Sequence, residues 1–136
     1  MRHSSVLLSG LGFALVMLSS ASVAQTSFDF GKIEYQASCA SCHGVTAKGN
    51  GAVSNYLIKA PSDLTIMAKR NGGVFPYQYA LEVIDGRKSV EIGVHGSREM
   101  PVWGYIYRSE DTQPADLHAR NRIGSLLDYL VRIQVK

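Results

Sequence analysis

The chain has 136 residues, 46% of them hydrophobic, so one small domain with a modest core is expected. Its 14 basic and 11 acidic residues give a formal net charge of +3. The basic residues form no run and do not alternate with aromatic residues, so the composition does not indicate a nucleic-acid-binding surface.

The first 24 residues have the pattern of a secretory signal peptide. Arg2 precedes an apolar run from Val6 to Leu18, and small residues ending at Ala24 follow. The run is shorter than the about 20 residues that a membrane-spanning helix needs, so cleavage is favoured over an uncleaved anchor. We therefore expect residues 1–24 to be removed on export and residues 25–136 to form one domain. Loss of Arg2 would lower the net charge by one unit.

The remaining sequence is predicted to be all-α. Four helices are expected between capping or helix-breaking residues: from Ser27 or Asp29 to about Cys39, from Pro61 to Arg70, from Pro76 to Asp85, and from Pro114 to about Gln134. The first places Phe30, Ile33 and Ala37 on one side. The last carries an apolar stripe at helical spacing, formed by Ile123, Leu126, Leu127, Leu130 and Ile133. Residues 44–51 and 87–113 are expected to be irregular, and no segment alternates as a strand would.

The most specific motif follows the first expected helix. Residues Cys39-Ala40-Ser41-Cys42-His43 form a C-x-x-C-H sequence, the attachment signature of a c-type haem. Two thiols on one helical turn can form thioethers with the two vinyl groups of one porphyrin, and the imidazole of His43 can then ligate the iron. One covalent haem c per chain is therefore expected.

Other interpretations of this motif have less support. A zinc site needs about four ligands, and the chain has only these two cysteines. A thioredoxin-like redox pair would accompany a βαβ pattern, which the sequence lacks. A simple disulfide between Cys39 and Cys42 stays open in an oxidising compartment.

The sixth iron ligand has four candidates: Met67, His95, Met100 and His118. Met67 and His118 fall in expected helices, where core packing and solvation are their ordinary roles. Met100 lies in a long irregular segment and precedes Pro101, which favours an extended backbone. We expect Met100 to be the ligand, with His95 as its rival. A thioether ligand raises the iron potential relative to a second histidine.

Together these residues resemble the class I bacterial cytochromes c over the whole of residues 25–136. The motif stands near the start, Met100-Pro101 late, and a helix at each end. Gly31 and Tyr35 match the small and aromatic residues that this family places at a helix crossing, and Leu126 and Tyr129 match their partners. The resemblance implies a small cytochrome c fold around one haem, with crossing terminal helices, in the periplasm.

The resemblance also suggests neighbours of the haem. In much of the family a proline carbonyl accepts the N–H of the proximal imidazole. Here Pro61 is the nearest proline after the motif, and a carbonyl within residues 51–53 is the alternative. Trp103 is expected to fill the core, although its N–H could meet a propionate. Side chains that could lie at the haem edge are Arg87, Lys88, His95 and Arg98, and glycines suited to a loop close to a flat ring are Gly93, Gly96 and Gly104.

The function implied by the resemblance is one-electron transfer, not enzymatic catalysis, because two axial ligands leave the iron no open position. The expected partners are redox proteins: a periplasmic dehydrogenase, a quinol-oxidising complex or a terminal oxidase. Neither nucleic-acid binding nor stable membrane insertion is expected. Two alternatives remain: an electron-transfer subunit of a larger periplasmic oxidoreductase, and a haem enzyme or gas sensor with a labile sixth ligand.

Overall fold

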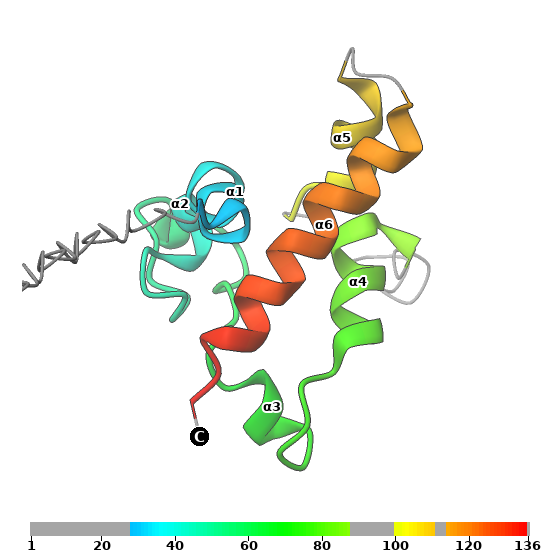
Figure 1. The fold of residues 1–136 in the computed structure, drawn as a ribbon. Helices are drawn as coiled ribbons and strands as arrows, with labels where there is room; N and C mark the ends of the chain where they lie inside the picture. Colours follow the sequence, from blue (N-terminus) through cyan, green and yellow to red (C-terminus); the bar gives the residue numbers. More distant parts are fainter. Residues whose placement is uncertain (1–27, 88–99, 111–113, 136) are drawn as a thin grey trace, which may run out of the picture.

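The structure is a computed structural model that describes residues 28–87, 100–110 and 114–135. The expected signal peptide therefore lies outside the described residues. Helices account for all regular structure in the described ranges, which confirms the all-α prediction. The elements are α1 (Phe30–Ser38), α2 (Ala40–His43), the 3-10 helix η1 (Ser54–Tyr56), α3 (Met67–Arg70), α4 (Tyr77–Asp85), α5 (Trp103–Ser109) and α6 (Ala115–Arg132) (Figure 1).

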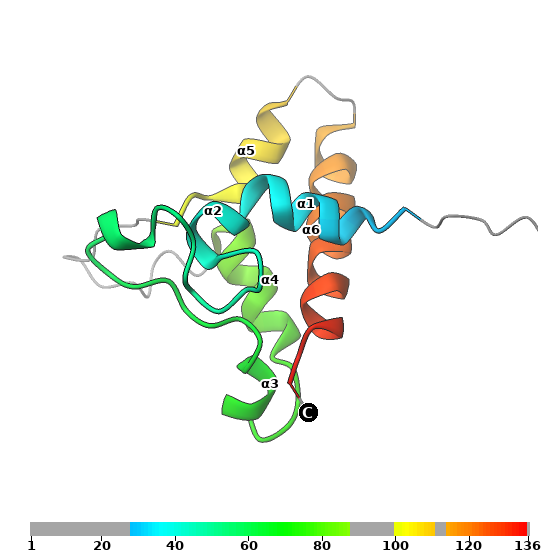
Figure 2. The same cartoon turned by 90° about the vertical axis from the view of Figure 1, so that its left-hand side faces the viewer.

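The centre of the fold is the crossing of α1 over α6 (Figure 2). A Cβ atom built on Gly31 would lie only 2.0 Å from the carbonyl oxygen of Ser125, so the absence of a side chain permits the close approach. The Tyr35 ring is fully buried and lies 5.3 Å from the Tyr129 ring, centroid to centroid. The expected contact between the two terminal helices is therefore present.

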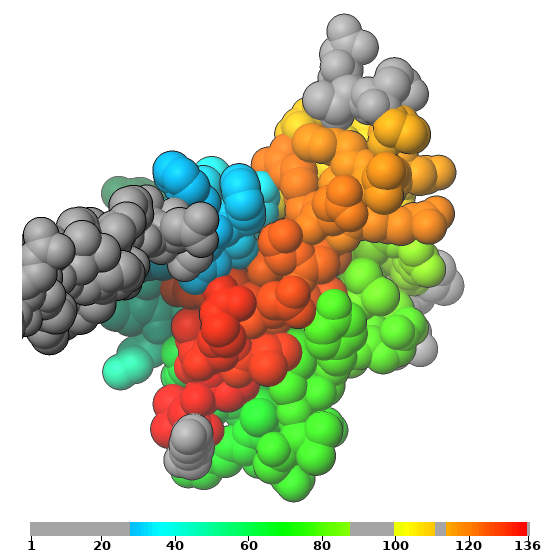
Figure 3. Space-filling view, in the orientation of Figure 1, coloured from blue at the N-terminus to red at the C-terminus, as the bar shows by residue number. Residues whose placement is uncertain are grey.

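The apolar stripe of α6 forms much of the core. Ile123, Leu126, Leu127 and Leu130 are buried, as is Ala119, and Ile133 packs against them. These side chains lie between α1 on one side and α4 and α5 on the other, and Figure 3 shows α6 between α1 and α4 at the surface.

The buried side of α1 differs from the expected one. The Asp29 carboxylate accepts a hydrogen bond from Lys32 N at 3.0 Å, so the predicted cap is confirmed. However, Phe30 and Ile33 are 70% and 50% exposed. The buried residues of α1 are instead Gly31, Glu34 and Tyr35, because Gly31 allows contact with α6 and distant polar groups bind Glu34.

Two further boundaries require correction. The expected helix from Pro61 begins only at Met67, because the Asp63 carboxylate accepts from Thr65 N and forms a local turn. Residues 103–109, expected to be irregular, form α5. The prediction of α4 is confirmed, with Pro76 before it and Gly86 after it at φ +91°.

Within the described ranges, even the longest helix is too polar to serve as a membrane span.

Candidate haem site

The three motif residues lie where α1 passes into α2. Cys39 N donates to Tyr35 O at 2.9 Å and His43 N donates to Cys39 O at 2.9 Å, so Cys42 and His43 occupy the turn that follows Cys39. Both thiols are free, with Cys39 buried and Cys42 half-buried. Burial, with the Glu34 carboxylate and Cys42 nearby, raises the pKa of the Cys39 thiol to about 12. This shift is opposite to that of a metal-binding or redox-active cysteine, which is stabilised as the thiolate.

The imidazole of His43 is oriented by one backbone carbonyl. Its Nδ1 atom lies 2.9 Å from the carbonyl oxygen of Ser62. A carbonyl oxygen only accepts hydrogen bonds, so Nδ1 is the donor, and in the neutral imidazole Nε2 keeps a lone pair. This arrangement of a ligand histidine, with one nitrogen bound to a carbonyl and the other available, is typical of metal-binding histidines.

The acceptor was therefore predicted one residue too early. The carbonyl of Pro61 instead lies against Gly49, where an added Cβ would come within 2.2 Å of it. The alternative, a carbonyl within residues 51–53, is also wrong, because His43 Nδ1 bonds to Ser62 O. The carbonyls of Gly51 and Val53 accept instead from Ser54 N and Tyr56 N, each at 3.0 Å. No sequence signal identified Ser62, because any residue type can present a backbone carbonyl.

The segment that contains the Ser62 carbonyl is held from two directions. Leu64 N donates to Ala47 O at 2.8 Å, on the loop that follows the motif. From the other end of the chain, Val135 N donates to Thr65 O, and Gln134 Nε2 donates to Leu64 O, both at 2.8 Å. The orientation of His43 therefore depends on both the loop after the motif and the end of α6.

Met100 lies on the rim of the core cluster that contains Cys39. The rim consists of partly buried apolar side chains, which also include Ala40, Leu64, Met67, Phe75, Leu81 and Trp103. Side chains of this kind suit contact with a flat, largely apolar porphyrin, and the chain offers a donor set of two thiols, an imidazole and thioethers. Because Met67 belongs to the same rim, burial alone does not separate the two methionines. The two methionines differ in their backbone: Met67 is the first residue of α3, whereas Met100 lies outside the helices, before α5.

The other predicted residues have varied surroundings. Trp103 is half-buried at the start of α5, with its ring 5.6 Å from the Tyr107 ring, as core packing requires. Arg87 is bound to the Asp85 carboxylate at 2.5 Å, so a carboxylate other than a propionate is already its partner. Gly104 contacts Asp85 from within α5, which corrects its expected place in a loop. His95, Lys88, Arg98, Gly93 and Gly96 lie outside the described residues.

His118 binds another side chain in the structure. Its Nε2 atom lies 2.9 Å from Glu110 Oε2, across from α5. Its expected role as a solvated side chain is therefore corrected to that of a hydrogen-bond partner of Glu110.

In the described part of the chain, no three His, Cys, Asp or Glu side chains lie close enough together to hold a metal ion. Comparison of the sequence with protein-family models finds no match, and neither curated proteins nor solved structures match the chain.

Proposed function

We propose that this chain is a c-type cytochrome that transfers single electrons between partner proteins. One observation carries the proposal: His43 of the C-x-x-C-H motif donates through Nδ1 to the Ser62 carbonyl and leaves Nε2 available. Two free thiols on the same turn support it, as does the position of Met100 among the apolar side chains that pack against the core cluster containing Cys39.

Each residue has a distinct role in this proposal. Cys39 and Cys42 would hold the porphyrin through two thioethers, and His43 and Met100 would ligate the iron. When bound, the haem supplies a reversible one-electron couple between Fe(III) and Fe(II). The chain contributes the position of the ligands and the exclusion of water by the rim. In the cytochrome c fold proposed here, α1 and α6 are the crossing terminal helices.

Covalent attachment is the first claim to test. Protein isolated from the periplasm should retain its haem through acid–acetone extraction, and its mass should equal that of the chain from Gln25 plus one haem. The double variant Cys39→Ala/Cys42→Ala should contain no covalent haem. Loss of haem from the wild-type protein on extraction would refute the proposal.

Ligation by Met100 needs a separate test. The oxidised protein should show the long-wavelength charge-transfer band that the resemblance implies for an iron–thioether bond. Met100→Ala should abolish the band and lower the reduction potential. Met67→Ala is the matched control, because Met67 is a thioether on the same rim, and it should leave the band unchanged. A band that survives Met100→Ala would show that another residue is the ligand.

A diffusible carrier is the form of the function that we propose, with a periplasmic dehydrogenase, a quinol-oxidising complex or a terminal oxidase as partner. The low net charge expected after loss of Arg2 gives little long-range attraction, so rates of electron transfer should fall only modestly as ionic strength rises. Persistent co-elution with a large complex would favour a bound subunit, and rapid carbon monoxide binding to the reduced wild-type protein would favour a haem enzyme or sensor.

A further inference from the structure

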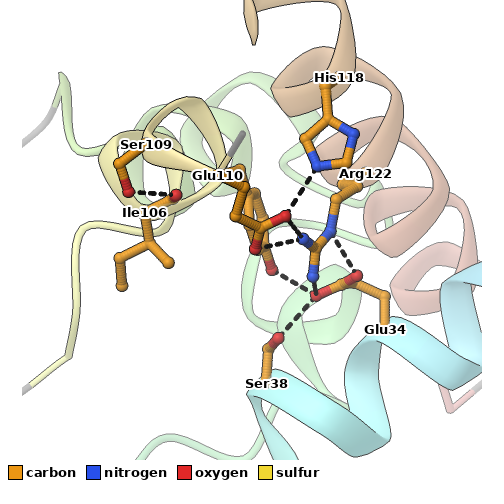
Figure 4. A network of polar contacts seen from close by, with 8 residues as sticks. Glu34, Ser38, Ile106, Ser109, Glu110, His118 and Arg122 are labelled. Atoms are coloured by element: carbon orange, nitrogen blue, oxygen red, sulfur yellow. Dashed lines mark hydrogen bonds and ion pairs between the residues drawn. The ribbon is translucent and has the colours of Figure 1, made fainter. Parts of the chain in front are cut away.

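A network of polar side chains joins α1, α5 and α6 (Figure 4). At its centre is the carboxylate of Glu34 on α1, whose side chain is only 11% exposed. Its Oε1 atom accepts from the hydroxyl groups of Ser38 and Tyr107, each at 2.6 Å. Arg122 on α6 donates to both carboxylate oxygens, at 2.8 and 2.9 Å. Glu34 is thus bound by groups from three helices.

The network extends from Arg122 to Glu110, just beyond the end of α5. Arg122 donates to both oxygens of Glu110, and its guanidinium lies 4.0 Å above the centre of the Tyr107 ring. Burial by itself would raise the pKa of Glu34, but the bonds from Arg122 and the two hydroxyl groups outweigh it, and the pKa lies below its ordinary value. Glu34 is therefore ionised at neutral pH, and its hydrogen bonds are charge-assisted.

The network involves the two helices that are connected in sequence to the proposed iron ligands His43 and Met100. Glu34 and Ser38 belong to the helix that leads directly into Cys39. Tyr107 belongs to α5, which begins at Trp103, shortly after Met100. The bond from Tyr107 to Glu34 therefore connects the helix that enters the motif to the helix that follows Met100.

Side-chain bonds are especially important for α5, because a helix of 7 residues is too short to be stable alone. On its other side, Arg108 donates to the Asp85 carboxylate of α4, whose side chain is only 3% exposed. Gly104 packs directly against the same Asp85. These attachments to α4 and the bond from Tyr107 help to fix the place of α5, which begins three residues after Met100.

We propose that Tyr107 and Glu34 are positioning residues for the sixth iron ligand, and that their hydrogen bond holds Met100 in reach of the iron. This inference rests on the proposed ligation by Met100. A thioether carries no charge, so it is attracted to iron less strongly than an anionic ligand, and the placement of the segment that carries it matters. Loss of a hydrogen bond to a charged group should raise the fraction of protein with Met100 detached by about tenfold.

The haem-loaded protein provides the test, with Tyr107→Phe compared against Ser38→Ala. Each variant removes one hydroxyl group that donates to Glu34 Oε1 at 2.6 Å, but only Tyr107 lies on α5. Two properties are measured well below the unfolding temperature of each variant: the charge-transfer band of the oxidised protein, and the rate of carbon monoxide binding to the reduced protein, which requires an open sixth position. Tyr107→Phe should weaken the band and raise the rate about tenfold, whereas Ser38→Ala should change the rate less than about twofold.

A second pair covers the case in which Tyr107→Phe does not fold. Glu34→Gln retains an oxygen that can accept from Tyr107 and should keep the band, whereas Glu34→Ala removes the acceptor and should weaken it. Wild-type rates in Tyr107→Phe or in Glu34→Ala would overturn the positioning role. A wild-type protein with covalent haem but no charge-transfer band would refute Met100 ligation itself, and the positioning role with it. Loss of covalent haem attachment is a separate result, since it would refute the proposed function.

Discussion

Replacement of Gly31 by alanine should push α1 slightly away from α6 and destabilise the fold. A Cβ atom at this position would lie 2.0 Å from Ser125 O, 2.9 Å from Ser125 C and 2.8 Å from Tyr129 Cβ. Two of these three atoms belong to the backbone of α6, so no change of rotamer can relieve the contact. The helices would have to move apart by about 1 Å to reach even the shortest tolerated separation of 3.0 Å, and the buried Tyr35 ring would lose contacts with α6.

The expected cost follows from two opposing effects. Overpacking in a well-packed core costs about 1–3 kcal/mol, and a contact with backbone belongs at the upper end of this range. Alanine returns at most about 1 kcal/mol through its higher helix propensity. We therefore expect Gly31→Ala to lower the free energy of unfolding by about 1–2 kcal/mol, which corresponds to roughly 4–8 °C in the midpoint of thermal unfolding.

The assay is urea and thermal unfolding of the haem-loaded protein, followed by circular dichroism. Gly124→Ala on α6 is the matched control, because a Cβ atom there would meet nothing within 4 Å. It should be neutral or raise the stability by up to about 1 kcal/mol. A Gly31→Ala variant as stable as Gly124→Ala would refute the close crossing of α1 and α6.

Three other predictions concern different parts of the chain. The pKa of Glu34 is lower in the folded protein than its ordinary 4.5, so its contribution to stability is present above that value and is lost as the pH falls through the folded pKa. Glu34→Gln should therefore weaken the dependence of urea unfolding on acid pH. An unchanged dependence would contradict this. Gln134→Ala should lower the free energy of unfolding by about 1–3 kcal/mol, since it removes three hydrogen bonds of 2.8 Å to part-buried backbone groups. Gln78→Ala removes one exposed hydrogen bond and should lower the free energy of unfolding by less than about 0.5 kcal/mol. Without haem, Cys39→Ala/Cys42→Ala should be largely unfolded by far-UV circular dichroism, because a small domain has a marginal core, and cooperative unfolding of a helical apo-protein would contradict that expectation.

The helices that the sequence predicted best are those whose boundaries depend on local chemistry. Asp29 caps α1 through its own side chain, and α4 lies between Pro76 and Gly86. The stripe of α6 is long enough for its helical period to be recognised. In these cases the residues that define the element are close together in sequence.

The predictions failed where distant residues decide the outcome. Apolar periodicity favoured Phe30 and Ile33 as packing residues, yet Glu34 is buried because Arg122 and Tyr107 satisfy its carboxylate. Helix α5 was missed because its spacing signal comes from three residues, Trp103, Ile106 and Tyr107, too few to distinguish a helix from chance.

Within the candidate site, residue chemistry was predictable and backbone geometry was not. The motif identifies Cys39, Cys42 and His43 without reference to the fold. The acceptor for the His43 imidazole depends on how residues 61–65 turn, and there the Asp63 carboxylate binds Thr65 instead of capping a helix. Such local side-chain bonds compete with helix formation, and in the resulting turn it is the carbonyl of Ser62 that accepts from His43.

Residues 134 and 135 help to hold the segment that orients the His43 imidazole, although they are far from the motif in sequence. Gln134 Nε2 donates to Leu64 O, and Val135 N donates to Thr65 O. Leu64 and Thr65 follow Ser62, whose carbonyl accepts from the imidazole, by two and three residues. The same α6 that leads to these residues crosses α1 at Gly31, and α1 leads into Cys39. One helix therefore braces both the segment that carries the cysteines and the segment that orients the histidine. Because the bond from Nδ1 tunes the basicity of a ligand imidazole, we expect displacement of α6 to change the reduction potential of a bound haem as well as the stability of the fold.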